Sequence, residues 1–258
     1  MTKPLLTFIV VASALAFSIS AGAQTPALTG AAKWADSAAR EINKATIEGD
    51  IDRLHAARTL LDHALASYPN DAVLLHYKGY EAFREGGLMY ARNRQSEIPA
   101  LMKEASTALE KSDSIKPMPE THALRASALG SLIGADQSLA PTLGPEIQQE
   151  MSAAISTGTT NPRVWLLRGI STMYTPPEYG GGLSEAETQL SKAVALFNID
   201  NPIPPAPSWG RAEAYAWLGQ VLQRENKPSE ALAAYNKALA LEPNYVWVKY
   251  GLLPSVKK

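Results

Sequence analysis

From Gln24 onward, apolar residues recur at the three- and four-residue spacing of one helix face, and the alternating pattern typical of strands is scarce. Glycine, proline and asparagine interrupt this pattern at intervals of roughly three to four helical turns. The sequence therefore predicts an all-α protein built from helical hairpins. The interruptions fall at 49–50, 69–71, 86–87, 117–119, 141–145, 161–162, 174–187, 202–207, 227–228 and 243–244.

A longer period is clearest in residues 212–244, AEAYAWLGQVLQRENKPSEALAAYNKALALEPN. Small residues stand there at fixed intervals with larger ones beside them, and a bulkier side chain at such a helix crossing is expected to cost about 1–3 kcal/mol. The segment resembles the tetratricopeptide repeat family, whose unit is a helix–turn–helix of about 34 residues. The positions that carry the resemblance are Leu218, Gly219, Ala231, Tyr235, Ala238 and Pro243.

Weaker copies of this signature occur upstream. One hairpin cannot bury its own apolar faces, so neighbouring hairpins must stack. The resemblance therefore implies a right-handed superhelix of about five helix pairs over residues 24–258, and residues 245–254, YVWVKYGLLP, are predicted to form a C-terminal capping helix. The upstream signature positions are Ala57, Ala64, Gly79, Gly169, Ala186 and Ala193.

Two copies carry extra residues between their paired helices. In the best copy, 12 positions separate the glycine of the first helix from the first alanine of the second, against 17 in the copy that opens at Trp165 and 26 in the copy that contains Gly79. Insertions on one face of a repeat protein often form its binding edge, and an extended, solvated helix end is the alternative for the longer one. The predicted loop residues are Tyr90, Arg92, Arg94, Tyr179, Gly180, Gly181 and Gly182.

The three consecutive glycines precede Ser184 and Glu187, which are predicted to form a capping box at the start of the next helix. An anion site at this helix N-terminus is the alternative. It is disfavoured because no Lys-Ser or Lys-Thr follows the glycines, as a phosphate-binding loop requires. Glu185 and Glu187 would also repel phosphate. The glycines are therefore predicted to form a structural or partner-contacting loop.

The first 23 residues have a different pattern. Lys3 is followed by an apolar run from Pro4 to Ile19 and by Ala21-Gly22-Ala23, the order of a secretory signal peptide. The run is short for a membrane span of about 20 apolar residues, which makes an uncleaved anchor the less favoured alternative. We therefore expect cleavage after Ala23 and a periplasmic or secreted domain.

Nothing in the sequence nominates a catalyst or a cofactor. The chain has no cysteine and four histidines, none of which lies in a zinc-binding helix motif. No nucleophile elbow occurs, and Glu48, Asp50 and Asp52 lack the glycine and distal glutamate of a calcium loop. The net charge of −1 gives no reason to expect nucleic acid as a partner. A non-catalytic protein without a cofactor or metal is predicted.

The resemblance further implies a concave groove lined by the first helix of each pair. Lysines that would capture a peptide carboxylate are replaced by His76, Leu124, Leu166 and Ala216. The leading hypothesis is an adaptor that binds a partner peptide or helix in the groove, with packing between repeats as the alternative role of these side chains. A small-molecule-binding accessory subunit of a solute-transport system is the second hypothesis. The predicted groove residues are His76, Tyr80, Phe83, Arg84, Arg163, Leu166, Ile170, Tyr174, Gln220 and Arg224.

Overall fold

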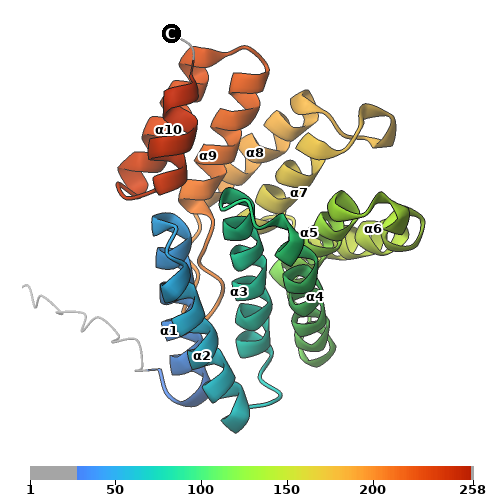
Figure 1. Cartoon of the computed structure of the whole chain (residues 1–258), viewed down its shortest axis with the longest axis vertical. Coiled ribbons are helices and arrows are strands. Elements are labelled where there is room, and N and C mark those ends of the chain that lie inside the picture. The colour runs from blue at the N-terminus through green and yellow to red at the C-terminus, as the bar shows by residue number, and fades with distance from the viewer. Residues whose placement is uncertain (1–27, 257–258) are drawn as a thin grey trace, which may run out of the picture.

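A computed structural model describes residues 28–256, and the predicted signal peptide lies outside them. Between these limits no residue is in a β-strand, and ten α-helices form five successive pairs (Figure 1), which confirms the all-α repeat fold. The helices are α1 Gly30–Glu48, α2 Ile51–Ser67, α3 Ala72–Ala91, α4 Ile98–Ile115, α5 Pro119–Ala135, α6 Ala140–Thr157, α7 Pro162–Tyr174, α8 Leu183–Phe197, α9 Arg211–Arg224 and α10 Pro228–Leu241.

Several helices begin where a short polar residue can cap them. The Asp71 carboxylate accepts hydrogen bonds from the backbone N–H groups of Val73 and Leu74 at 3.0 and 2.9 Å. Asp50 caps α2 and Asn161 caps α7 in the same way. Each such cap satisfies backbone donors that the helix leaves unpaired and contributes about 1 kcal/mol.

Glycines allow the two helices of a pair to cross closely, as the repeat signature predicts. A Cβ atom on Gly219 would lie 2.4 Å from the Tyr235 ring, and one on Gly79 would lie 2.5 Å from Leu109. In the fourth pair, a Cβ atom on Gly169 would lie 2.6 Å from the Leu190 side chain. The signature alanines are also buried: Ala57, Ala64, Ala186, Ala193, Ala231 and Ala238.

Two of the predicted interruptions are wrong, because the helices continue through them. Gly86 and Gly87 lie inside α3, where a Cβ on Gly86 would come within 2.4 Å of the Met102 methyl group on α4. Pro145 lies inside α6, whose first turn holds Pro141. The insertion in the second pair thus lengthens α3 and α4, and Tyr90 lies in the last turn of α3 instead of a loop.

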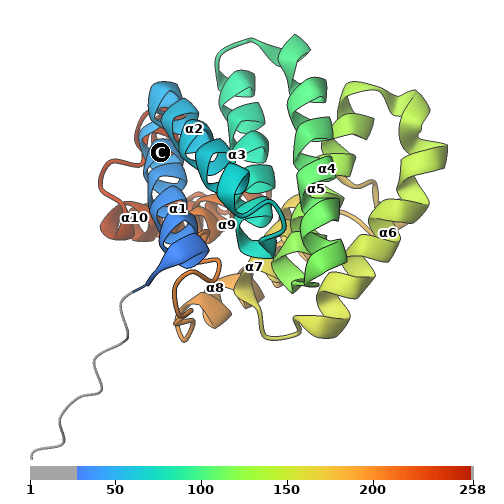
Figure 2. The same ribbon diagram turned by 90° about the horizontal axis from the view of Figure 1, so that it is seen from below.

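The C-terminal end of the stack comes to lie next to α1 (Figures 1 and 2). After α10, a π-helical segment Trp247–Leu252 buries Val248 and Leu252, as expected of a cap. Val246 packs against Gly49 at the end of α1. A Cβ atom on Gly49 would lie 3.0 Å from a methyl group of Val246. The first pair therefore packs against the segment that follows the last pair.

Candidate binding surface

The segment between α8 and α9, residues 198–210, lies against α3 and α7, the first helices of the second and fourth pairs. We call this segment the strap. Tyr77 on α3 donates its hydroxyl hydrogen to the carbonyl oxygens of Pro205 and Ala206, each at 3.3 Å. The Trp209 ring stacks on the Tyr80 ring with centroids 4.8 Å apart. Both tyrosines are buried, so the strap fills this part of the predicted groove.

An ion pair between a buried arginine and a half-buried aspartate holds the start of the strap. Arg163, the second residue of α7, is 2% exposed and donates from Nη2 to Asp200 Oδ2 at 2.7 Å. Its guanidinium also lies 5.5 Å from the centroid of the Phe197 ring. A buried charge is costly unless it is paired, so this contact holds the strap to α7.

The strap changes the role of the predicted groove residues. Five of them are buried and form the core between the repeats and the strap, which is the packing alternative rather than an open groove. Three more are half-buried, Phe83, Ile170 and Gln220. Only Tyr174 and Arg224 are exposed. The buried five are His76, Tyr80, Arg84, Arg163 and Leu166.

His76 is an uncharged core residue. Its Nδ1 lies 2.9 Å from Thr121 Oγ1, which joins α3 to α5. Burial, reinforced by the positive charge of Arg163, lowers the pKa of His76 to about 3. An imidazole with such a pKa is neutral at physiological pH and serves as a hydrogen-bonding side chain in the core.

Arg84 on α3 and Glu213 on α9 connect the second pair to the fifth. Arg84 Nη1 donates to Glu213 Oε1 at 2.7 Å, and both residues are buried. The guanidinium also lies 4.8 Å from the centroid of the Tyr80 ring and 5.5 Å from that of Trp209. The pair therefore closes the stack and supports the strap from one side.

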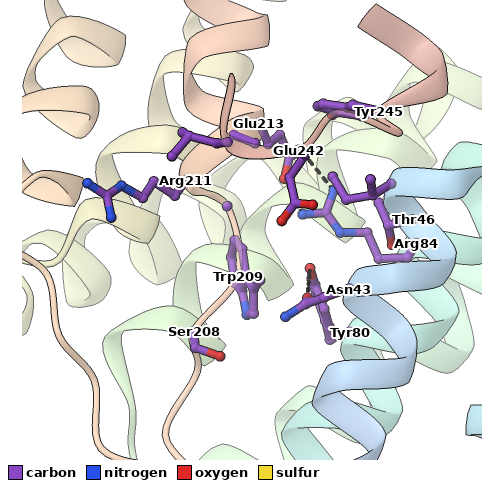
Figure 3. A pocket seen from close by; sticks show the side chains of 14 residues that line it. Asn43, Thr46, Tyr80, Arg84, Ser208, Trp209, Arg211, Glu213, Glu242 and Tyr245 are labelled. Atoms are coloured by element: carbon purple, nitrogen blue, oxygen red, sulfur yellow. Dashed lines mark hydrogen bonds and ion pairs between the residues drawn. The ribbon is translucent and has the colours of Figure 1, made fainter. Parts of the chain in front are cut away.

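A pocket of about 270 Å³ lies beside this ion pair, between α1, α3, the strap and the end of α10 (Figure 3). Asn43, Tyr80 and Trp209 contribute to its wall, and Tyr80 donates its hydroxyl hydrogen to Asn43 Oδ1 at 3.2 Å. Ligand pockets usually measure about 300–1,000 Å³. This pocket is small, and much of its wall is already engaged in contacts within the chain.

The part of the predicted groove that stays open carries aromatic rings and one arginine. We call Tyr90, Tyr174, Trp217, Arg224 and Trp247 the aromatic patch. Ring centroids are 6.3 Å apart for Tyr174 and Trp217, and 4.9 Å apart for Trp217 and Trp247. The Arg224 guanidinium lies 5.8 Å from the centroid of Tyr174, which is 61% exposed.

Tyr90 lies in the last turn of α3, near enough to Tyr174 to affect its pKa. Partial burial and then the neighbouring hydroxyl of Tyr90 raise the pKa of Tyr174, whereas Arg224 lowers it. Tyr90 itself is 69% exposed. Sequence reasoning placed Tyr90 in a loop and missed the two tryptophans, although Trp217 follows the predicted groove position Ala216 directly. The patch thus joins the C-terminal ends of α3, α7 and α9.

The glycine loop is a compact turn with two residues in the left-handed region, Gly180 at φ 79° and Gly182 at φ 116°. Its chain folds back so tightly that a Cβ on Gly181 would lie 1.8 Å from the Thr175 carbonyl oxygen. The predicted capping box is wrong, because Gly182 is the N-cap and Ser184 lies inside α8. The loop exposes Tyr179.

The Glu187 side chain, which the capping box was to use, has a different partner. Glu187 accepts a hydrogen bond from Lys227 Nζ at 2.7 Å, which ties α8 to the turn before α10. The loop therefore owes its shape to its glycines and not to a side-chain cap.

In the other insertion, Arg92 donates to the Gly49 carbonyl at 2.7 Å and Arg94 to Glu97 at 2.6 Å.

Within residues 28–256, no group of three or more histidine, aspartate or glutamate side chains is arranged to hold a metal ion. None of the helices in that part of the chain combines the length and hydropathy needed to cross a bilayer.

Comparison with known proteins agrees with the repeat described above. Residues 212–245 match the family model of the tetratricopeptide repeat. A thermophilic tetratricopeptide-repeat protein from Thermus thermophilus aligns with a TM-score of 0.56 and 18% identity, over 82% of this chain and 95% of its own. The chain therefore contains a tetratricopeptide repeat at residues 212–245, and its overall fold resembles that of a tetratricopeptide-repeat protein.

A second solved structure, the HusA haemophore from Porphyromonas gingivalis, aligns with a TM-score of 0.60 and 23% identity. The alignment covers 73% of this chain and 92% of that one. At this identity the likeness concerns the fold alone. A search of curated proteins found no match.

Proposed function

We propose that the chain is a non-catalytic binding protein of the periplasm that holds a protein partner on the aromatic patch. The observation that carries this proposal is the exposure of Tyr90 and Tyr174 beside Trp217, Trp247 and Arg224. Aromatic and arginine side chains dominate the binding energy of protein interfaces. Tetratricopeptide repeats typically mediate protein–protein interactions, which supports the same function.

Two neighbouring features favour the aromatic patch, and not the part of the groove covered by the strap, as the binding site of the partner. The strap occupies the N-terminal halves of α3 and α7, so a partner there would have to displace it. The glycine loop follows Tyr174 directly and exposes Tyr179. A partner on the patch therefore has a second contact within reach.

Photo-crosslinking in the native compartment tests this function. A benzoylphenylalanine at position 174 is expected to give one discrete covalent adduct with a protein. The matched control position is Tyr250, which is 69% exposed and contacts none of the patch rings. The same adduct from both positions, or none from position 174, would contradict the proposal.

A planar aromatic ligand is the second candidate, and it corresponds to the small-molecule hypothesis. The likeness to a haemophore and the three rings of Tyr174, Trp217 and Trp247 favour it. Titration with haemin is expected to give a saturable absorbance change that Tyr174→Ala weakens and Tyr250→Ala does not. If neither variant changes the titration, the aromatic patch is not the binding site for haemin.

The periplasmic location rests on the pattern of residues 1–23. N-terminal sequencing of the protein recovered from a periplasmic fraction is expected to begin at Gln24. A chain that retains Met1 in the cytoplasmic fraction would overturn this part of the proposal.

A further inference from the structure

Trp217 is the ring around which the aromatic patch is arranged. The plane of the Tyr174 ring stands at 86° to its plane, and the Trp247 ring lies at 57° to it with centroids 4.9 Å apart. Trp217 itself is half-buried in α9. The contacts that both neighbouring rings make therefore depend on the direction in which the Trp217 indole points.

A buried carboxylate holds this indole from the inside. Trp217 Nε1 donates a hydrogen bond to Glu213 Oε1 at 3.3 Å. The two residues are four positions apart on α9 and so lie on one face of the helix. Both oxygens of Glu213 also accept hydrogen bonds from the two Nη atoms of Arg84 on α3 (Figure 3). The N–H edge of the indole therefore faces the interior, and the opposite edge is left for the surface.

The contact with Arg84 makes this acceptor a fixed one. A guanidinium that binds both oxygens of a carboxylate sets its plane as well as its position. Arg84 is held in turn, because its guanidinium lies 4.8 Å from the centroid of the Tyr80 ring and 5.5 Å from that of Trp209. A tryptophan side chain has several staggered rotamers, and a fixed acceptor selects the one that brings its N–H within hydrogen-bond distance.

We propose that Glu213 is a positioning residue of the aromatic patch and that Arg84 acts through it, an inference that rests on the proposed protein-binding function. A surface whose rings are already oriented loses less side-chain entropy when a partner binds. Loss of the acceptor leaves every ring of the patch in the chain but frees the Trp217 indole to rotate. Partner binding then weakens although Glu213, which is buried, does not touch the partner.

Two double variants of the full-length mature protein separate this role from stability. Arg84→Met with Glu213→Leu removes the acceptor, and Arg84→Met with Glu213→Gln keeps an acceptor oxygen for the indole. Neither variant leaves a buried charge unpaired, and replacement of a buried ion pair by apolar side chains of similar size is often tolerated. The two variants differ only in whether the side chain at position 213 can accept the Trp217 N–H.

Nuclear magnetic resonance of the indole N–H groups tests the orientation. With leucine at position 213, the Trp217 resonance is expected to shift and its hydrogen exchange to become at least about tenfold faster than in the unaltered protein. Glutamine at that position should restore part of the protection. The Trp165 indole, which donates to the Thr159 carbonyl oxygen at 2.8 Å, is the internal reference and should not change.

Photo-crosslinking from position 174 tests the consequence for binding. The yield of the partner adduct is expected to fall at least about fivefold with leucine at position 213 and to recover in part with glutamine. Glu187→Gln is the control, because it removes a carboxylate that pairs with Lys227 away from the patch, and it should leave the yield unchanged.

Equal adduct yields from the two double variants, or an unaltered yield with leucine at position 213, would overturn the proposal and leave the proposed function standing. An unshifted Trp217 resonance in the leucine variant would also overturn it. If neither double variant folds, indole exchange in the unaltered protein decides, and exchange of the Trp217 N–H as fast as that of a free indole would contradict the proposal. Absence of any adduct from the unaltered chain would instead remove the proposed function.

Discussion

Gly219 shows how a single missing methyl group permits the helix crossing. A Cβ at this position would lie 2.4–2.6 Å from the Tyr235 ring atoms, in a core that cannot shift freely. We expect Gly219→Ala to lower the free energy of unfolding by about 1–3 kcal/mol, measured by urea denaturation. Gly130 lies inside α5 with no atom within 4 Å of its Cβ position. Gly130→Ala should therefore stabilise by about 0.5–1 kcal/mol, and destabilisation would contradict this account.

His76 makes stability depend on pH. Its pKa is about 3 in the folded chain against 6.5 as the reference for the unfolded chain. Between these values the unfolded state binds a proton that the folded state does not. The free energy of unfolding is therefore highest, as far as His76 is concerned, above pH 6.5. It falls as the pH is lowered towards 3, by up to about 1.4 kcal/mol per pH unit.

The measurement is the free energy of unfolding as a function of pH for the wild type and His76→Asn. The variant retains a hydrogen-bonding side chain beside Thr121 but cannot titrate. Its pH slope below 6.5 is expected to be shallower than that of the wild type. Parallel curves would mean that His76 is not buried as described.

At the scale of the element, Trp209 is one of the residues that attach the strap to the helices. The indole is buried and stacks on Tyr80, whereas Ile203 in the same segment is 73% exposed. We expect Trp209→Ala to cost about 3–5 kcal/mol of unfolding free energy. Ile203→Ala should change it by less than about 0.5 kcal/mol. Equal effects of the two substitutions in thermal unfolding would show that the strap is not seated in the groove.

The sequence predicts the helix pairs and the repeat, because local periodicity and small residues at crossings are local signals. It does not predict the strap. The prolines of 202–207 read only as an interruption between helices, and the surface that such a segment covers is set by residues such as Tyr77 and Tyr80, more than a hundred positions away. The predicted capping box is wrong because α8 begins at Leu183 with Gly182 as its N-cap, and Glu187 pairs instead with Lys227 on another pair.

At the scale of the whole molecule, the Arg84–Glu213 pair closes the stack. Removing one partner leaves the other charge buried and unpaired, so Glu213→Gln is expected to cost about 3–5 kcal/mol. The double variant Arg84→Met, Glu213→Gln should recover part of that loss. The more exposed pair of Glu187 with Lys227 is the control, and Glu187→Gln should cost at most about 1 kcal/mol. Additive losses in the double variant would contradict a coupled closure.

The sequence also does not predict which of the groove residues become buried when the chain folds. The repeat register placed ten residues on a groove, but five of them are buried in the core of the folded chain. The exposed patch emerges only from that packing, because Trp217 and Trp247 belong to different elements that meet in three dimensions. Local patterns therefore located the face but not its open part.

The most direct test of the central claim compares two single thiols on α7, which is possible because the chain has no cysteine. Leu166→Cys places a thiol at a buried groove position near the end of the strap, and Tyr174→Cys places one in the aromatic patch. The thiol at 174 is expected to react with an aqueous disulfide reagent at least about a hundred times faster than the one at 166, with equal rates in denaturant. Similar rates in the native protein would show an open groove and contradict the account.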